Sequence, residues 1–148
     1  MEYKGKIRKI GFPIDEVICS ATEDPVAAVV QAAGGRGVDV VINAAPSLSA
    51  VDLAFKIAPK MGRVSLFASV PKDNPFLAID VNNIHYKQIS VFGASDSTAK
   101  DHSEAVGLLA SGRVSLRPLV SAVYALRDFF TAIEQIKGQS AFKVLIAP

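Results

Sequence analysis

Three short segments of small residues each follow an apolar run that the sequence predicts to be a strand. They are residues 43–45, 68–70 and 93–95. Small side chains leave backbone N–H and C=O groups accessible, and such groups can bind a flat polar ring or a ribose. The candidate ligand-binding residues are Asn43, Ala44, Ala45, Ala68, Ser69, Val70, Gly93, Ala94 and Ser95. If the three strands are adjacent and parallel, these segments line one rim, where open α/β sheets bind their ligands.

The first of these segments ends the most informative stretch of the chain, residues 34–45. A glycine turn with Gly34, Gly35 and Gly37 leads into an almost continuous apolar run at 38–43. Strands covered by helices on both faces lose the alternation of polar and apolar residues, so this run predicts a buried parallel strand. A buried strand that is followed only by a tight turn, without a ligand, is the alternative interpretation.

The remaining elements alternate between strands and helices along the chain. The sequence predicts further strands at 16–19, 63–67, 88–92, 121–124 and 143–146. Helices are expected at about 25–33, 47–57, 98–111 and 126–136, with an irregular stretch and one helical turn at 77–87. This order is typical of an α/β fold with a doubly wound, mostly parallel sheet of the Rossmann kind.

Composition limits the classes of protein to consider. The chain has 148 residues, 50% of them hydrophobic, which is enough for one packed domain. No apolar run reaches the length that spans a membrane, and the net charge of +2 is modest. We therefore expect a cytoplasmic protein that binds neither membrane nor nucleic acid. The basic cluster at 4–9 is either a phosphate-binding arm or, as we favour, a solvated helix.

Side chains that could catalyse a reaction are few and scattered. Cys19, His85 and His102 occur singly, without the spacing of a zinc site, and no nucleophile is expected beside either histidine. His85 either faces the pocket or, as we favour, lies in a surface turn, and His102 lies on the wet side of its helix. Asp96 and Asp101 are interpreted as loop and first-turn acids. We assign no catalytic residue and no metal ligand.

Several stretches resemble the nucleotide-binding domain of the medium-chain dehydrogenase/reductase superfamily, especially its polyol and sorbitol dehydrogenase branch. The most specific are residues 35–41, 62–67, 84–93, 108–114 and 143–146. The resemblance implies that the three strand ends line the ribose and nicotinamide half of an NAD or NADP site. It also implies that Lys143 lies near the cofactor phosphates. The full-length enzymes of this family transfer a hydride between a secondary alcohol and the nicotinamide.

Two parts of that family pattern are missing from the sequence. The G-x-G-x-x-G turn and the acidic residue that follows it are not found, and the cluster at 34–37 precedes a strand instead of opening a helix. We expect residues 1–148 to form a single, partial Rossmann-type domain that starts about 50 residues into the family's domain, since a βαβ unit takes 30 or more residues. The zinc-bearing catalytic domain is expected to be absent, and the isolated chain inactive.

The missing first strands leave a sheet edge that must be paired. The strand at 16–19 could pair directly with 38–43, or another chain could supply the pairing. We expect a homo-oligomer through sheet edges, for which the family often uses the strand at 88–92. A non-catalytic module that oligomerises or binds a nucleotide remains an alternative. A second alternative is that the chain is one half of a split dehydrogenase and binds a complementary dehydrogenase chain.

Overall fold

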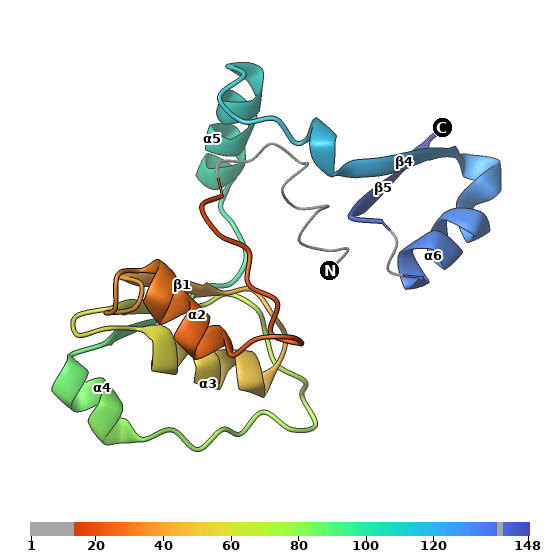
Figure 1. Ribbon diagram of the computed structural model, residues 1–148. Helices are drawn as coiled ribbons and strands as arrows, with labels where there is room; N and C mark the ends of the chain where they lie inside the picture. Colours follow the sequence, from red (N-terminus) through yellow and green to blue (C-terminus); the bar gives the residue numbers. More distant parts are fainter. Residues whose placement is uncertain (1–13, 139–140) are drawn as a thin grey trace. The chain divides into compact units, whose positions relative to one another are not determined.

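A computed structural model describes residues 14–138 and 141–148 (Figure 1). The basic cluster at 4–9 lies outside the described residues. The chain divides into two compact units, Asp15–Asp96 and one that includes Ser97–Pro148, and each is described by itself. The sequence predicts a single domain over 1–148, and this stays a prediction. Both units combine helices with parallel strands, so the predicted α/β class is confirmed.

The unit Asp15–Asp96 contains a three-stranded parallel sheet in the order β1-β2-β3. Its strands are β1 (Val40–Asn43), β2 (Arg63–Leu66) and β3 (Ser90–Gly93). The helices of this unit are α2 (Pro25–Ala32), α3 (Leu48–Ile57) and α4 (Val81–Lys87). The predicted adjacency and direction of the three strands are thus correct. The irregular stretch at 77–87 contains a seven-residue helix instead of one turn.

The core of this unit lies between α3 and one face of the sheet. It is formed by Val51, Ala54, Phe55, Ala58, Val64 and Ile89. On the opposite face, Val40, Ile42 and Phe92 are 47%, 66% and 52% exposed. The prediction that the strand at 38–43 is buried on both faces is therefore wrong within this unit, because helices of the unit cover only one face.

Residues 16–19 do not form the predicted strand. The carbonyl of Cys19 accepts hydrogen bonds from the amides of Thr22 and Glu23, and the Glu23 carboxylate accepts one from the Cys19 amide. These bonds make a turn that leads into α2, whose first amides are capped by Asp24. The amide and carbonyl of Cys19 are thus used locally, and β1 has no strand on its outer side among the described residues.

The second unit holds a separate two-stranded parallel sheet. Its strands are β4 (Val120–Ala125) and β5 (Lys143–Ala147), and α6 (Phe129–Lys137) joins them after a short 3-10 turn, Leu126–Asp128. Among the described residues, β4 and β5 pair only with each other. Ala132 is the buried residue of α6, whereas Phe129 and Phe130 are 43% and 81% exposed.

The helix α5 (Ala99–Ala110) also belongs to this unit. Thr98 caps its start and it ends before Gly112, close to the predicted 98–111, and its apolar residue Val106 is 63% exposed. No helix among the described residues is long and apolar enough to cross a membrane.

A capping box at the start of α5 leads to a pH prediction. The Asp101 carboxylate accepts hydrogen bonds from the Thr98 amide and hydroxyl, each at 2.7 Å, and these bonds hold its pKa below the usual value. Because the folded pKa is depressed, the stabilisation is present above the unfolded pKa and is lost as pH falls through the folded pKa.

We expect the helical circular-dichroism signal to decline on acidification, and the decline to be smaller for Asp101→Asn. The matched control is Glu104→Gln on the same helix, where Glu104 pairs with Lys100 in an exposed ion pair. Equal acid profiles for wild type and Asp101→Asn would contradict this role for the carboxylate.

Candidate functional site: a rim at three strand ends

The carboxyl ends of the three parallel strands lie in register. Asn43 is paired with Leu66, and Leu66 with Gly93, so the segments that follow leave the sheet at the same edge. Hydrogen bonds continue one step beyond the strands: the carbonyl of Asn43 accepts from the amides of Phe67 and Ala68, and that of Leu66 from Ala94. The structure thus brings residues 43–45, 68–70 and 93–95 together, as the sequence predicts.

These bonds use part of the rim's hydrogen-bonding capacity. The amides of Ala68 and Ala94 donate to the neighbouring strand, and the Ala45 amide donates to the side-chain oxygen of Asn43 at 3.3 Å. Within the described residues, the amides of Ser69 and Ser95 have no protein acceptor. Among the predicted rim residues, the amides of Ser69 and Ser95 therefore remain available as donors to a ligand.

Asn43 supplies an additional unpaired donor at the rim. Its side chain is 5% exposed, and its Nδ2 atom has no hydrogen-bond partner among the described residues. Leaving a buried amide unpaired costs free energy, so such a group calls for a partner that the unit does not provide. The sequence identified Asn43 by its position after the strand, but only the structure shows that its side chain is buried.

Two pockets adjoin the rim. One, of about 490 Å³, is lined by Ala68, Ser69 and Val70 together with apolar side chains from α3 and from the segment before α4. The other, of about 560 Å³, is lined by Ala45 and by Ser47, Ser49 and Lys56 near α3. The sequence analysis missed the lining residues Leu48, Leu77 and Ile79. The spacing of Leu77 and Ile79, two residues apart, is the signal that could have indicated them.

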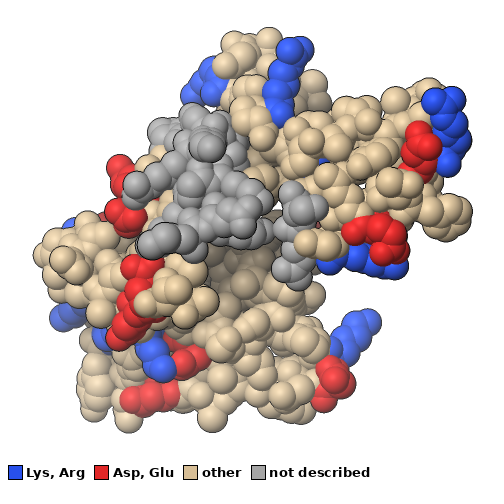
Figure 2. All heavy atoms as spheres, turned by 45° about the vertical axis from the view of Figure 1, so that its right-hand side comes forward, with Lys and Arg blue, Asp and Glu red and all other residues tan. Residues whose placement is uncertain are grey.

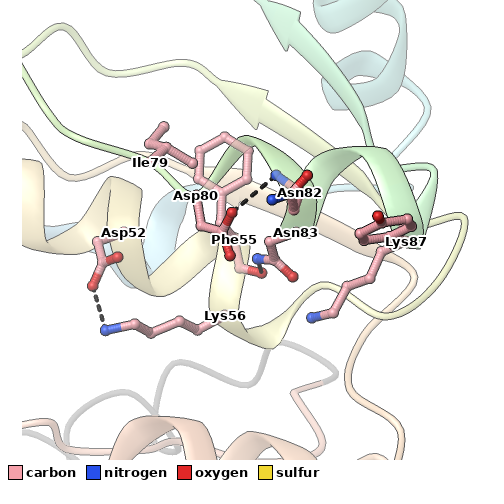
Figure 3. A pocket seen from close by; sticks show the side chains of 9 residues that line it. Asp52, Phe55, Lys56, Ile79, Asp80, Asn82, Asn83 and Lys87 are labelled. Atoms are coloured by element: carbon pink, nitrogen blue, oxygen red, sulfur yellow. Dashed lines mark hydrogen bonds and ion pairs between the residues drawn. The ribbon is translucent and has the colours of Figure 1, made fainter.

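A third pocket, of about 400 Å³, lies between α3 and α4 (Figure 3). Several of its polar groups are already paired inside the protein: Lys56 Nζ lies 2.6 Å from Asp52, Lys87 Nζ donates to the Ala58 carbonyl, and Asp80 caps α4. Asn83 donates to the carbonyl of Phe55. The bonds of Asn83 and Lys87 link α4 to α3 and the residue after it, so this pocket is a weaker candidate for a ligand.

The scattered candidate side chains do not form a catalytic group. His85 is exposed on α4, not in the surface turn that we favoured from the sequence. His102 Nε2 lies 3.0 Å from Ser97 Oγ, so the expectation that no nucleophile neighbours a histidine is wrong. That pair is exposed, however, and no third side chain is described that orients the imidazole.

Cys19 is partly buried, and a hydrogen bond with the Thr22 side chain lowers the pKa of its thiol. The described residues contain no group of three or more His, Cys, Asp or Glu side chains that could hold a metal ion. The side chains in the described part of this chain therefore do not form a site that fits a zinc ion.

Lys143 begins β5 in the other unit and is exposed. Its expected proximity to cofactor phosphates stays a prediction. On the face drawn in Figure 2, several lysine and arginine side chains lie beside aspartate and glutamate side chains.

The parallel sheet places these small residues at its carboxyl edge, which is where open α/β proteins bind their ligands. Residues 4–111 match the sequence model of the zinc-binding dehydrogenases, and the chain belongs to this family. The resemblance found in the sequence is thus confirmed.

Two relatives and one solved structure illustrate the match. The chain is 32% identical over 115 residues to 2-dehydro-3-deoxy-L-galactonate 5-dehydrogenase of Pseudoalteromonas atlantica, covering 78% of this chain and 33% of that protein. It is 29% identical over 146 residues to sorbitol dehydrogenase of Halalkalibacterium halodurans, covering 97% of this chain and 40% of that protein.

The fold is similar to that of benzyl alcohol dehydrogenase from Acinetobacter calcoaceticus. The TM-score is 0.83 at 22% identity, over 98% of this chain and 40% of that one. At this identity the likeness shows the fold alone. The chain thus spans between a third and two fifths of the length of the two relatives that it matches.

Proposed function

We propose that this chain is a cofactor-binding portion of an NAD(P)-dependent, zinc-type alcohol or polyol dehydrogenase. The observation that carries the proposal is the register of Asn43, Leu66 and Gly93, which aligns three small-residue segments at one sheet edge. Membership of the zinc-binding dehydrogenase family and similarity to a sorbitol dehydrogenase support this reaction class. In the complete enzyme, the cofactor would accept or donate the hydride that is exchanged with a secondary alcohol.

The rim fits one half of the cofactor better than the other. The amides of Ser69 and Ser95 are donors suited to the carbonyl and hydroxyl oxygens of a nicotinamide riboside. The described residues contain no glycine-rich turn from a strand into a helix N-terminus, which is the feature that binds a pyrophosphate. We therefore assign the nicotinamide and its ribose to this rim.

This assignment predicts a difference between the two mononucleotide halves of the cofactor. Nicotinamide mononucleotide should shift the NMR amide signals of Ser69 and Ser95 with a dissociation constant of about 1 mM or weaker, as fits half of a site. Adenosine monophosphate at the same concentration should leave those signals unchanged.

A bulky substitution within the rim tests where the nucleotide lies. Ser69→Trp should abolish the shift of the Ser95 amide signal, whereas Ser115→Trp, at an exposed position in the other unit, should preserve it. Equal responses to both mononucleotides, or a shift that survives Ser69→Trp, would exclude the proposed position of the nicotinamide.

Catalysis by the isolated chain is a separate question. We expect no turnover of sorbitol-like polyols with NAD or NADP, because the described residues contain no group of three or more side chains that could hold a zinc ion. Robust activity of the chain alone would refute this expectation. If the chain is half of a split enzyme, adding a polypeptide that carries the remaining length of its relatives should restore activity.

A non-catalytic module is the second candidate function. The outer edge of β3 is unpaired among the described residues, and Val91 and Phe92 on this strand are 41% and 52% exposed. Unpaired edges recruit other strands, so we propose homo-oligomerisation through β3. The β3 amides should then be protected from hydrogen exchange at high but not at low protein concentration. Concentration-independent exchange would contradict pairing at this edge.

A further inference from the structure

The pocket of about 490 Å³ that adjoins the rim is lined mainly by apolar side chains. These come from α3, from the end of β2 and from the segment between β2 and α4: Leu48, Val51, Leu66, Val70, Leu77 and Ile79. All of them except Val51 are only half-buried, so the open pocket leaves part of their apolar surface in water. A ligand that covered these side chains would gain the free energy of burying that surface.

Two different backbone periodicities bring these side chains to the same space. Leu48 and Val51 are three residues apart on α3, so they lie on one face of the helix. Leu77 and Ile79 are half-buried while the residues before and between them are exposed, which is the alternation of an extended segment. Val51 belongs to the core cluster, and Leu77 and Ile79 pack against it. The core therefore holds the walls of the pocket in place before any ligand binds.

The lining also determines the chemical class of molecule that the pocket can bind. No Asp, Glu, Lys or Arg is among the described residues that line it. A charged group moved from water into this pocket would lose hydration without gaining an opposite charge, which costs free energy. Ser69 is the lining residue with a polar side chain, and its hydroxyl has no hydrogen-bond partner among the described residues. Apolar walls with one polar group that fixes orientation are typical of small-molecule sites.

We propose that this pocket binds a neutral, mainly apolar small molecule that carries one hydroxyl or carbonyl group, and that Ser69 Oγ forms the hydrogen bond to that group. An engineered apolar cavity of about 150 Å³ binds benzene, so a pocket of about 490 Å³ has room for a ring with substituents. The nucleotide assigned to the rim uses the Ser69 amide, whereas this ligand uses the Ser69 hydroxyl. The proposal therefore does not depend on nucleotide binding.

Three probes with the same ring separate the contributions of shape, hydrogen bonding and charge. p-Cresol, toluene and p-toluate share a methyl-substituted ring, which carries in addition a hydroxyl group, no group or, at neutral pH, a carboxylate. p-Cresol should shift the methyl NMR signals of Leu48, Leu77 and Ile79 in the full chain with a dissociation constant of about 1 mM, as fits a ligand of this size. Toluene, which lacks the hydrogen bond, should bind about 5-fold more weakly, and p-toluate at least about 10-fold more weakly.

The methyl signals of Leu126 are the control within the same titration. Leu126 is an exposed apolar residue of the other unit, so its signals should not move. Ser69→Ala should weaken the binding of p-cresol about 5-fold and leave that of toluene unchanged. Ser95→Ala, at a rim position outside the pocket lining, should change neither. Equal binding of p-cresol and p-toluate, or a preference for p-cresol over toluene that survives Ser69→Ala, would overturn the proposal.

A substitution that fills the pocket tests where the probe binds. Leu48→Trp places a larger side chain in the pocket wall and should abolish the shifts that p-cresol causes at Leu77 and Ile79. Leu126→Trp, at the exposed position in the other unit, should preserve them. Hydrogen-exchange protection of the β2 amides shows that each variant is folded. Shifts at Leu77 and Ile79 that persist in folded Leu48→Trp would overturn the proposal, whether or not the rim binds a nucleotide.

Discussion

Replacing Gly37 with alanine is expected to lower the free energy of unfolding of the unit Asp15–Asp96 by about 2–4 kcal/mol. Gly37 has φ of +91°, and a Cβ atom there would lie only 2.2 Å from the carbonyl oxygen of Ile57. The left-handed backbone costs an alanine about 1 kcal/mol, and displacing α3 from the start of β1 adds about 1–3 kcal/mol. Urea denaturation, monitored through the hydrogen exchange of the β2 amides, measures the loss of unfolding free energy.

Gly35 provides a matched control in the same turn. Its φ is +97°, but an added Cβ atom would meet nothing within 4 Å. Gly35→Ala should therefore lower the free energy of unfolding only by the cost of a left-handed backbone for alanine, about 1 kcal/mol. Equal losses for the two variants would show that the contact with Ile57 does not determine the cost.

The Gly37 variant is also expected to alter the rim. The amide of Val38 donates to the same Ile57 carbonyl, so the contact sets where the chain enters β1. A shift of β1 moves Asn43, the residue that ends the strand. Nicotinamide mononucleotide should then shift the Ser69 amide signal less in Gly37→Ala than in Gly35→Ala.

Replacing Phe55 with alanine is the second large expected effect. Phe55 is 4% exposed and lies in the cluster between α3 and the sheet, with Val51, Val64 and Ile89. Removing a buried phenylalanine ring costs about 3–5 kcal/mol, which is a large share of the total stability of a typical domain. We expect the midpoint of urea denaturation to fall strongly and β2 amides to lose protection from exchange.

Phe130→Ala is the control for this substitution. Phe130 is 81% exposed on α6, and substitutions at such positions change stability by about 0.5 kcal/mol or less. If Phe55→Ala reduced the exchange protection of the β2 amides as little as Phe130→Ala does, the assignment of Phe55 to the core would be contradicted.

Local patterns predicted the elements that depend on nearby residues. Asp24 and Pro25 start α2, and Thr98 and Asp101 start α5, because caps and first-turn residues act within one turn of helix. The apolar strands that end on small residues likewise predicted the rim. Its residues lie together because parallel strands in register end at one edge.

The sequence could not reveal which apolar side chains are covered. Val106 of α5 and Ile42 of β1 have the pattern of buried residues, yet they are 63% and 66% exposed. Burial depends on which element packs on a face, and periodicity identifies the face without its partner. The same limit explains residues 16–19, whose apolar pattern fits a strand but which have no neighbouring strand to pair with.

The sequence by itself determined the α/β class, the family resemblance and the positions of the three small-residue segments, since these follow from residue type and spacing. Only the tertiary structure decided that Asn43 is buried with an unpaired Nδ2, that the amides of Ala68 and Ala94 are already used, and that apolar side chains line an open pocket beside Ser69. Hydrogen-bond partners and exposure depend on residues far apart in the chain. They are therefore set by how the strands and helices pack.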